Sequence, residues 1–200
     1  KRYGGAIGMD MGLATIRSSV FTSNTTYFTE TVYGRGDAIF LTCNASCNYA
    51  GGCWVENSLF KNNENAYGQA VFHEKAGLTL VNNIFCGQSS HVSSSNCTAS
   101  HNAATPEKGE PAWRTKDPAL ISLAADAEVF EECPKDARRW VLREASGLID
   151  AGENVLWQEA AFDLNGDPRR VAYFSKKASI ADIGPSESPR RIPGLMLIVR

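Results

Sequence analysis

The chain has 200 residues, of which 43% are hydrophobic, and carries 20 Lys and Arg against 22 Asp and Glu for a formal net charge of −2. This length and apolar content suffice for one domain with an ordinary hydrophobic core. The balanced charge gives no electrostatic reason to expect binding to nucleic acid or to an anionic membrane. No apolar run reaches the roughly 18 residues of a membrane-spanning helix.

One pattern occurs three times in the region 1–90. Its copies start 32 residues apart, as Gly4-Gly5-Ala6-Ile7, Gly36-Asp37-Ala38-Ile39 and Gly68-Gln69-Ala70-Val71. In each copy an aliphatic residue follows, then a second one four positions later, a Phe, and an amide: Ile16-Val20-Phe21-Asn24, Val55-Leu59-Phe60-Asn63 and Leu80-Ile84-Phe85-Gln88. A period of this length indicates a solenoid, propeller or array, in which stacked units share one core.

Within each unit, apolar and small residues alternate, which is the periodicity of β-strands rather than helices. A unit is too long for one strand and a turn, so it must hold two or three strands and return to its start, as a coil of a parallel β-helix does. Equivalent residues should then stack in columns, at about 4.8 Å per coil. The expected columns are Ile7/Ile39/Val71, Ile16/Val55/Leu80, Val20/Leu59/Ile84 and Phe21/Phe60/Phe85.

Polar residues share the phase of these aliphatics at one point of every unit. They are Ser18, Asn57 and Asn82. We expect them to face inward and to form a polar corner in which Asn stacks on Asn, because a buried amide needs a hydrogen-bond partner.

The paired motifs resemble the G-G-A-I and F-x-x-N repeats of polymorphic outer-membrane-protein type β-helices, which belong to the pectate-lyase-like superfamily. The matching segments are Gly4 to Ile7 with Phe21 to Asn24, Gly36 to Ile39 with Phe60 to Asn63, and Gly68 to Val71 with Phe85 to Gln88. The resemblance covers about residues 1–90 and implies an all-β, right-handed parallel β-helix.

A second resemblance lies in the later half. Asp117-Pro118, Leu148 to Gly152, Asp163 to Arg169 and Ala181 to Gly184 are similar to the closing segment of many secreted bacterial β-helix proteins. It implies that the β-helix continues almost to the C-terminus. We therefore expect coils with a Cys-rich insertion at 40–53 in residues 1–100, and a loop, terminal coils and a closing segment of the same β-helix in 101–200. The Ser- and Asn-rich stretch 87–110 is predicted to be a long exposed loop.

The chain begins directly in a repeat, without a signal segment or a capping element, so we expect it to be a C-terminal fragment of a longer rod. The short apolar run Leu195 to Val199 is expected to be a closing strand or a contact with a neighbouring chain.

Six cysteines lie mostly in expected loops: Cys43, Cys47, Cys53, Cys86, Cys97 and Cys133. Disulfides are the favoured interpretation, with Cys86–Cys97 as the first choice of pair, and they would imply an oxidising compartment. Buried free thiols and a metal site are the alternatives.

Three sequons, at Asn24, Asn44 and Asn96, would agree with secretion and glycosylation. Asn44, in the Cys-rich insertion, is the best candidate. Asn24 ends a repeat motif, where its amide is expected to be occupied in a ladder.

Asp163, Asn165 and Asp167 have the alternating oxygen ligands that begin a calcium loop. Pro168 and Phe174 do not fit the rest of such a loop, and Asn-Gly followed by Asp-Pro forms turns unaided. A structural turn is the favoured reading and a Ca²⁺ ligand set the alternative; no other cofactor is expected.

No catalytic residues are assigned. A polygalacturonase-type site would need Asp-Asp and Gly-His-Gly besides Asn165-Gly166-Asp167 and Arg114-Thr115-Lys116, which we interpret as chance matches. Carboxylates for a lyase site are limited in the coils to Asp10, Asp37, Glu56 and Glu74, which we expect to be scattered over the exterior.

The sequence favours a non-catalytic extracellular or cell-surface module with a structural, adhesive or glycan-contacting role, whose partners are other protein chains or extracellular glycans. The loops 40–53 and 87–110 are expected to make the contacts. The alternative is a polysaccharide lyase or glycoside hydrolase whose cleft lies outside this chain or is degenerate in it.

Overall fold

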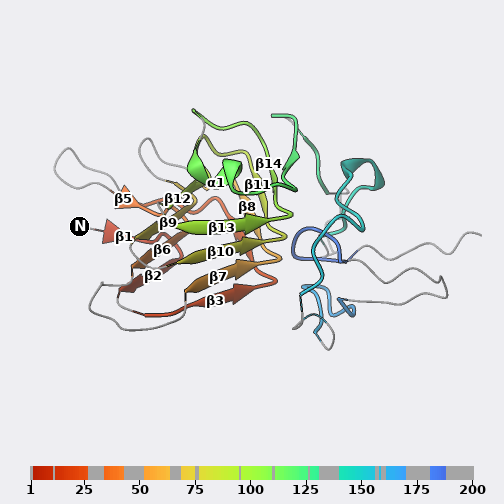
Figure 1. Ribbon diagram of the computed structural model, residues 1–200, viewed down its shortest axis with the longest axis horizontal. Helices are drawn as coiled ribbons and strands as arrows, with labels where there is room; N and C mark the ends of the chain where they lie inside the picture. Colours follow the sequence, from red (N-terminus) through yellow and green to blue (C-terminus); the bar gives the residue numbers. More distant parts are fainter. Residues whose placement is uncertain are drawn as a thin grey trace, which may run out of the picture.

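Parallel strands dominate the computed structural model (Figure 1). It describes residues 2–10, 12–26, 34–42, 52–63, 69–74, 77–94, 96–109, 111–125, 127–130, 140–155, 158, 161–169 and 181–187. In this part of the chain, three all-parallel sheets of four or five strands account for most of the regular structure, and one short α-helix is present. The fold is therefore all-β, as predicted.

The chain passes through the three sheets in a fixed order, and we call each passage a coil. Sheet 1 contains β2 (Ile7–Asp10), β6 (Ile39–Thr42), β9 (Val71–Glu74) and β12 (Val92–Ser93). Sheet 2 contains β3 (Thr15–Arg17), β7 (Cys53–Glu56), β10 (Leu78–Val81) and β13 (Cys97–Ser100). Sheet 3 contains β4 (Val20–Thr22), β8 (Leu59–Lys61), β11 (Ile84–Cys86), β14 (Ala103–Ala104) and β15 (Ile121–Ser122). This arrangement is compatible with a parallel β-helix.

The smaller elements lie outside this scheme. Strands β1 (Arg2–Tyr3) and β5 (Gly34–Arg35) form a parallel pair of their own. Helix α1 (Ala112–Thr115) and a 3₁₀ helix, η1 (Glu144–Ser146), complete the regular structure of the described residues.

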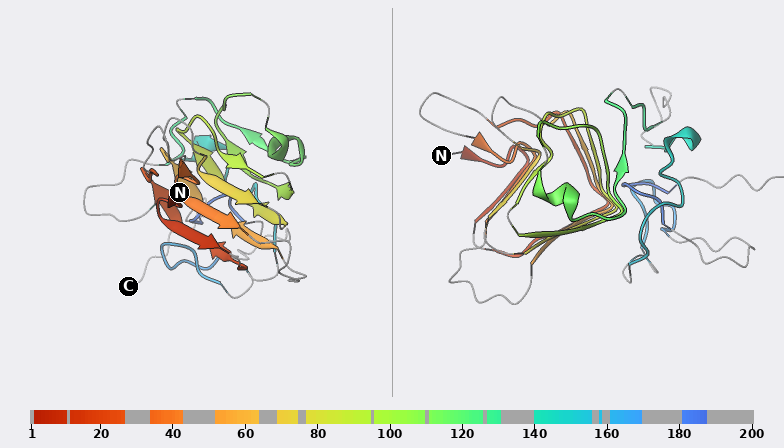
Figure 2. Two further views of the ribbon diagram at one scale, coloured as in Figure 1. Left: turned by 90° about the vertical axis from the view of Figure 1, so that its left-hand side faces the viewer. Right: turned by 45° about the horizontal axis from the view of Figure 1, so that its top comes forward.

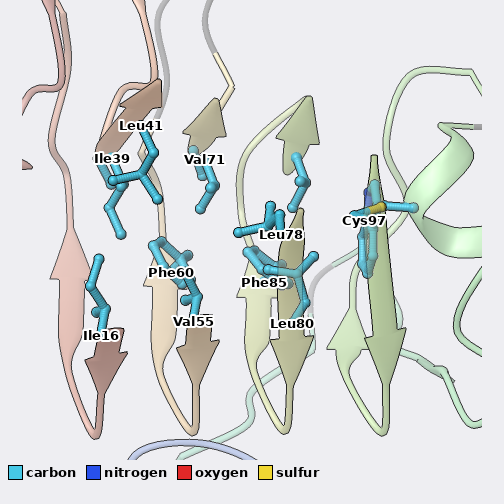
Figure 3. Packing of buried hydrophobic residues seen from close by; sticks show 14 of the residues in the cluster. Ile16, Ile39, Leu41, Val55, Phe60, Val71, Leu78, Leu80, Phe85 and Cys97 are labelled. Carbon is cyan, nitrogen blue, oxygen red and sulfur yellow. The ribbon is translucent and has the colours of Figure 1, made fainter. Parts of the chain in front are cut away.

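All four predicted columns are confirmed by the register of the strands. Ile39 pairs with Ile7 and Val71, Val55 with Ile16 and Leu80, Leu59 with Val20 and Ile84, and Phe60 with Phe21 and Phe85. Three of the columns form the inner core, which Figure 3 shows in part.

Aromatic rings stack along the inner face of sheet 3. The centroids of the Phe21 and Phe60 rings are 5.0 Å apart and the rings are nearly parallel, as are those of Phe60 and Phe85. The next residue in this column is Ala104, which leaves room above Phe85 for the indole of Trp113 on α1, 5.3 Å away and 1% exposed. Helix α1 thus lies within the outline of the coils and closes that end of the stack (Figure 2, right).

The fourth column faces the other way. Leu59 and Ile84 point out of the coils and belong to a second core with Leu148, Ile183 and further residues of the later half. Ser18, Asn57 and Asn82 share the phase of this column, so their predicted inward orientation is wrong. The strands of sheet 3 carry apolar residues on both faces, and the later half of the chain covers the outer one.

Residues 87–110 contain a fourth coil instead of the predicted exposed loop. Strands β12, β13 and β14 extend the three sheets, with Ala99 over Leu80 and Ala103 over Ile84. After Ser122 the described residues add no strand to these sheets, so the terminal coils expected there are not found in that part of the chain. Helix α1 occupies the place where another coil would stack.

Buried amides form a ladder beside the corner. The N–H of Ser58 donates to Asn83 Oδ1 at 3.0 Å, the N–H of Asn83 to Asn102 Oδ1 at 2.9 Å, and the N–H of Asn102 to Asp117 Oδ2 at 2.9 Å. The stacking expected of Asn57 and Asn82 therefore occurs one residue later in each coil. Its side-chain oxygens accept from backbone N–H groups that the turn takes out of the sheets.

The first glycine of the repeat has a backbone role. Gly4 and Gly36 have φ of 70° and 68°, in the left-handed region, and a Cβ there would collide with the carbonyl oxygens of Ile7 and Ile39. This explains why the motif starts with Gly.

Phe60→Ala should lower the free energy of unfolding by about 3–5 kcal/mol, because Phe60 is fully buried between two rings and its removal leaves a cavity. Chemical denaturation monitored by fluorescence measures the change. Thr22→Ala, on an exposed residue of the same sheet, is the control. Equal midpoints for Phe60→Ala and the wild type would contradict the stacked core.

Candidate functional site

A column of left-handed residues marks the corner between sheets 2 and 3. Ser18, Asn57, Asn82 and His101 have φ between 45° and 55°. Asn and His tolerate this conformation better than most residues. The turn directs their side chains outward, where the later half of the chain lies alongside (Figure 1).

Each corner residue contacts the later half. Ser18 Oγ accepts from Arg169 Nη2 at 2.9 Å, and Asn57 Oδ1 accepts from Gln158 Nε2 at 2.9 Å. Asn82 bonds Glu153 through both amide atoms, accepting its N–H at 2.7 Å and donating to its carbonyl at 2.8 Å. Glu153 Oε2 is also 3.7 Å from His101 Nδ1. These four corner residues thus form a docking strip for Glu153, Gln158 and Arg169.

Arg169, in the closing segment, is the centre of a buried polar cluster. Arg169 has a fully buried side chain that donates to the carbonyls of Gly184 and Pro185 at 2.9 and 2.7 Å, and to Glu187 Oε1 at 3.1 Å. Burial lowers the pKa of Arg169, while Glu187 is the main group that opposes this. Burial, followed by the nearby charge of Asp182, raises the pKa of Glu187 to about 8.

The oxygens of Asp163 are already occupied by backbone donors. Its Oδ1 accepts the N–H of Asn165 at 2.7 Å and of Asp167 at 2.8 Å, and its Oδ2 accepts the N–H of Glu187 at 2.7 Å. These are the contacts of a structural turn. Ca²⁺ binding by Asp163, Asn165 and Asp167 stays an untested prediction, and no group of three His, Cys, Asp or Glu suited to a metal occurs in the described ranges.

The four coil carboxylates occupy three different environments. Asp10 accepts from Thr42 Oγ1 at 2.6 Å, and Thr42 pairs in turn with Glu74, so Asp10 and Glu74 share one outer column of sheet 1. Glu74 also pairs with Arg35 at 2.8 Å.

The other two carboxylates are buried. Glu56 pairs with Arg17 at 2.7 Å on sheet 2, and Asp37 accepts from Thr26 Oγ1 at 2.7 Å in a turn. The expectation that all four lie on the exterior is therefore wrong for Glu56 and Asp37, because each has a local donor that compensates burial.

The Arg114-Thr115-Lys116 segment belongs to the end cap. Arg114 lies on α1 and donates to the carbonyl of Thr105 at 2.9 Å, next to Glu107 at 3.7 Å. Glu107 accepts from Trp113 Nε1 at 2.9 Å and from the His91 N–H at 2.8 Å, while burial raises its pKa. These contacts hold α1 on the last coil.

His91 lies fully buried under the same cap. Its ring packs on Phe85 with centroids 5.7 Å apart, and its Nε2 lies 2.9 Å from the Thr105 carbonyl, which requires a hydrogen on Nε2. Nδ1 has no hydrogen-bond partner within the described part of the chain. Burial is the main cause that lowers the pKa of His91, to about 4.

The three described cysteines are free and buried: Cys53, Cys86 and Cys97. The predicted Cys86–Cys97 disulfide is wrong, because Cys97 lies in the inner core and Cys86 in the second core outside sheet 3. Burial raises the pKa of all three thiols, to about 11 for Cys86. Cys43, Cys47 and Cys133 lie outside the described residues.

The sequons differ in accessibility. Asn24 donates through Nδ2 to Asn63 Oδ1 at 2.9 Å, which is the expected ladder contact. Asn96 is exposed just before β13. Asn44 lies outside the described residues, so the preferred glycosylation site stays a prediction.

The outer face of sheet 2 carries the best candidate contact surface. Thr15, Trp54, Thr79 and Thr98 form one column across its four strands, and Trp54 is only partly buried. The hydroxyls of Thr79 and Thr98 lie 3.3 Å apart on the surface. No described segment lies over this column in Figure 1 or Figure 2 (right), although Glu56 and Val81, nearer the corner of the same face, are buried; we call the column the open face.

Sequence reasoning missed the open face because it concentrated on loops. The signal was the position of Trp54, one residue after an inward Cys53 and one before an inward Val55, which places an indole outside. Thr79 stands at the same place in the next repeat.

Comparison of the chain with family models, with curated proteins and with solved structures finds no match. No helix among the described residues is long and apolar enough to cross a membrane.

Acid should destabilise the fold through His91. Unfolded His91 takes up a proton below about pH 6.5, whereas folded His91 does so only near pH 4, so stability present above pH 6.5 is lost as pH falls toward 4. His91 should lower the free energy of unfolding by about 1.4 kcal/mol for each pH unit in this range, and His91→Phe should remove that contribution. Urea denaturation of both proteins from pH 7 to 4 tests it; parallel curves would contradict a neutral buried imidazole.

Cys53, Cys86 and Cys97 should react with a thiol reagent only after unfolding, because all three are buried. Alkylation with and without denaturant, followed by peptide mass spectrometry without reduction, measures this. A disulfide-linked Cys86–Cys97 peptide from freshly purified protein would contradict the arrangement of the two cores.

Proposed function

We propose that this chain is a non-catalytic, right-handed parallel β-helix module of the pectate-lyase-like superfamily that works outside the cell or on its surface and contacts glycans. The repeat motifs and the in-register parallel sheets support the superfamily and the fold. The single observation that carries the contact role is the open face, where Trp54 lies among three threonines.

The chemistry of this face suits a sugar. One face of a pyranose ring presents C–H groups that can pack on an indole, while its hydroxyls can exchange hydrogen bonds with threonine hydroxyls. The column of these side chains crosses all four strands of sheet 2, so an extended chain could contact several coils at once. Because these groups stand on a sheet, no loop has to be ordered to present them, which lowers the ordering cost of binding.

A non-catalytic role is supported by how the coil carboxylates are used. Glu56 and Glu74 are each held by an arginine, and Asp10 and Asp37 each accept a hydrogen bond from a threonine. The alternative remains a polysaccharide lyase or glycoside hydrolase. Surface location rests on the family resemblance and the sequons, since the described cysteines form no disulfide that would favour an oxidising compartment.

Affinity electrophoresis in gels containing xylan, β-glucan or polygalacturonate tests the contact role. We expect at least one polysaccharide to retard the wild type, and Trp54→Ala to weaken the retardation at least tenfold because it removes the stacking surface. Phe162→Ala, which removes an aromatic ring that is 65% exposed elsewhere, is the matched control and should behave as the wild type. Retardation by none of the glycans would overturn the role.

The same samples should release no unsaturated or reducing product, with or without Ca²⁺. Product that disappears in Asp10→Asn or Glu74→Gln, the two carboxylates that share a column, would establish the enzymatic alternative.

A further inference from the structure

The open face carries no charged side chain, since it consists of one indole and three threonines. The next outward positions along β3 and β7 are Arg17 and Glu56, which pair with each other at 2.7 Å. A ligand on the open face therefore meets hydroxyls and one aromatic ring, while the adjacent charges already compensate each other.

The threonine hydroxyls of the open face lie across the strands from Trp54. Along β7, the outward position after Trp54 is the buried Glu56, and the outward position before it is Gly52, which has no side chain. Across the strands, Thr15 and Thr79 stand on either side of Trp54, with about 4.8 Å for each strand step. This step is similar to the length of one sugar ring in an extended chain. A polysaccharide that crosses the strands can therefore keep one ring on the indole and exchange hydrogen bonds with threonines on both sides.

Two glycines stand beside the open face, and packing explains one of them. A Cβ on Gly52 would lie 2.5 Å from the carbonyl oxygen of Gly77, so Gly52 is needed where two backbones approach closely. A Cβ on Gly77 would meet no described atom within 4 Å, and the φ of Gly77 is outside the left-handed region. Neither packing nor backbone conformation therefore requires glycine at position 77. Glycine in a strand also marks places where a ligand approaches the backbone.

Gly77 is next to the proposed stacking position. It stands two residues before Thr79, so both positions face outward by the alternation of the strand, and Thr79 pairs with Trp54. The corresponding positions in the first and fourth coils hold Leu13 and Asn96, which are both exposed. The third coil thus lacks a side chain, directly beside the open face, where the first and fourth coils carry one.

We propose that the ligand of the open face is an uncharged, extended polysaccharide that lies across the strands, and that Gly77 admits it beside Trp54. This inference rests on the proposed glycan contact and specifies its ligand. A polysaccharide with a negative charge on each sugar would have to lie on hydroxyls and an indole, next to an Arg17 that already has Glu56 as its partner. A side chain at position 77 would occupy the space in which the edge of a sugar ring meets Thr79.

Affinity electrophoresis compares the two charge classes. At least one of two uncharged glycans, β-glucan and unsubstituted xylan, should retard the wild type at least tenfold more strongly than polygalacturonate. Equal or stronger retardation by polygalacturonate, lost in Trp54→Ala, would overturn the uncharged ligand and leave the glycan contact in place. Retardation by none of the three would overturn the glycan contact itself, so the two failures are distinguishable.

Gly77→Leu should weaken retardation by the bound glycan at least tenfold, because the new side chain fills the place of the sugar, while its midpoint of urea unfolding stays that of the wild type. If leucine disturbs the fold, Gly77→Thr, whose branched side chain suits a strand, provides the second test. Thr22→Leu, which places the same side chain on an exposed position of sheet 3, is the matched control and should bind as the wild type does. Undiminished retardation of a folded Gly77 variant would contradict the role of Gly77.

Thr15→Ala combined with Thr98→Ala tests the direction of the bound chain. These threonines lie at the two ends of the open face, so the double variant should weaken retardation by about tenfold through the loss of two hydrogen bonds. Thr22→Ala combined with Thr115→Ala removes two exposed hydroxyls elsewhere and should leave binding unchanged. A Thr15 and Thr98 double variant that binds as tightly as the wild type would show that the chain does not cross the strands.

Discussion

Backbone pairing between successive coils, parallel and in register, is the constraint on which the rest of the structure depends. It places each residue next to its equivalent in the neighbouring coil, so residues of one kind form a column along the stack: aliphatic on aliphatic, phenylalanine on phenylalanine, amide on amide. A charged or oversized residue in an inner column would disturb two neighbours at once. The turn residues obey the same rule, since Asn83 and Asn102 can satisfy backbone groups only because the register holds them one above the other.

The parallel sheets could be predicted because the signal is internal to the sequence. Three repeats with the same spacings specify the columns whatever the turns between them do, and every predicted column is present. The fourth coil was missed because Ala99, Ala103 and Ala104 stand in it where the third coil has Leu80, Ile84 and Phe85. Its spacing was nevertheless intact: Ala99, Asn102 and Ala103 repeat Leu80, Asn83 and Ile84. The small residues of the fourth coil hid a repeat that its spacing alone would have identified.

The sequence did not predict in the same way which face of each strand points into the coils and which points out. A strand with apolar residues at both phases has two buried faces, but alternation alone does not say which is inside. Leu59 and Phe60 are adjacent, and only the later half of the chain decides that Leu59 faces it. The open face escaped notice for the converse reason: Trp54 reads as a core residue until the strand phase assigns it to the exterior. Pairwise contacts such as Ser18 with Arg169 have no local sequence signal at all.

The docking strip at the corner also determines the order in which the molecule can be completed. Coils can form one after another as the chain is made, because each needs only its neighbour. The cover over sheet 3 cannot, since Ser18 and Arg169 are 151 positions apart and Asn57 and Asp182 are 125 apart. Until the closing segment is synthesised, the outer column of Val20, Leu59 and Ile84 is bare, and such transient apolar surface promotes aggregation. A later part of the polypeptide therefore protects coils that can form before it is made.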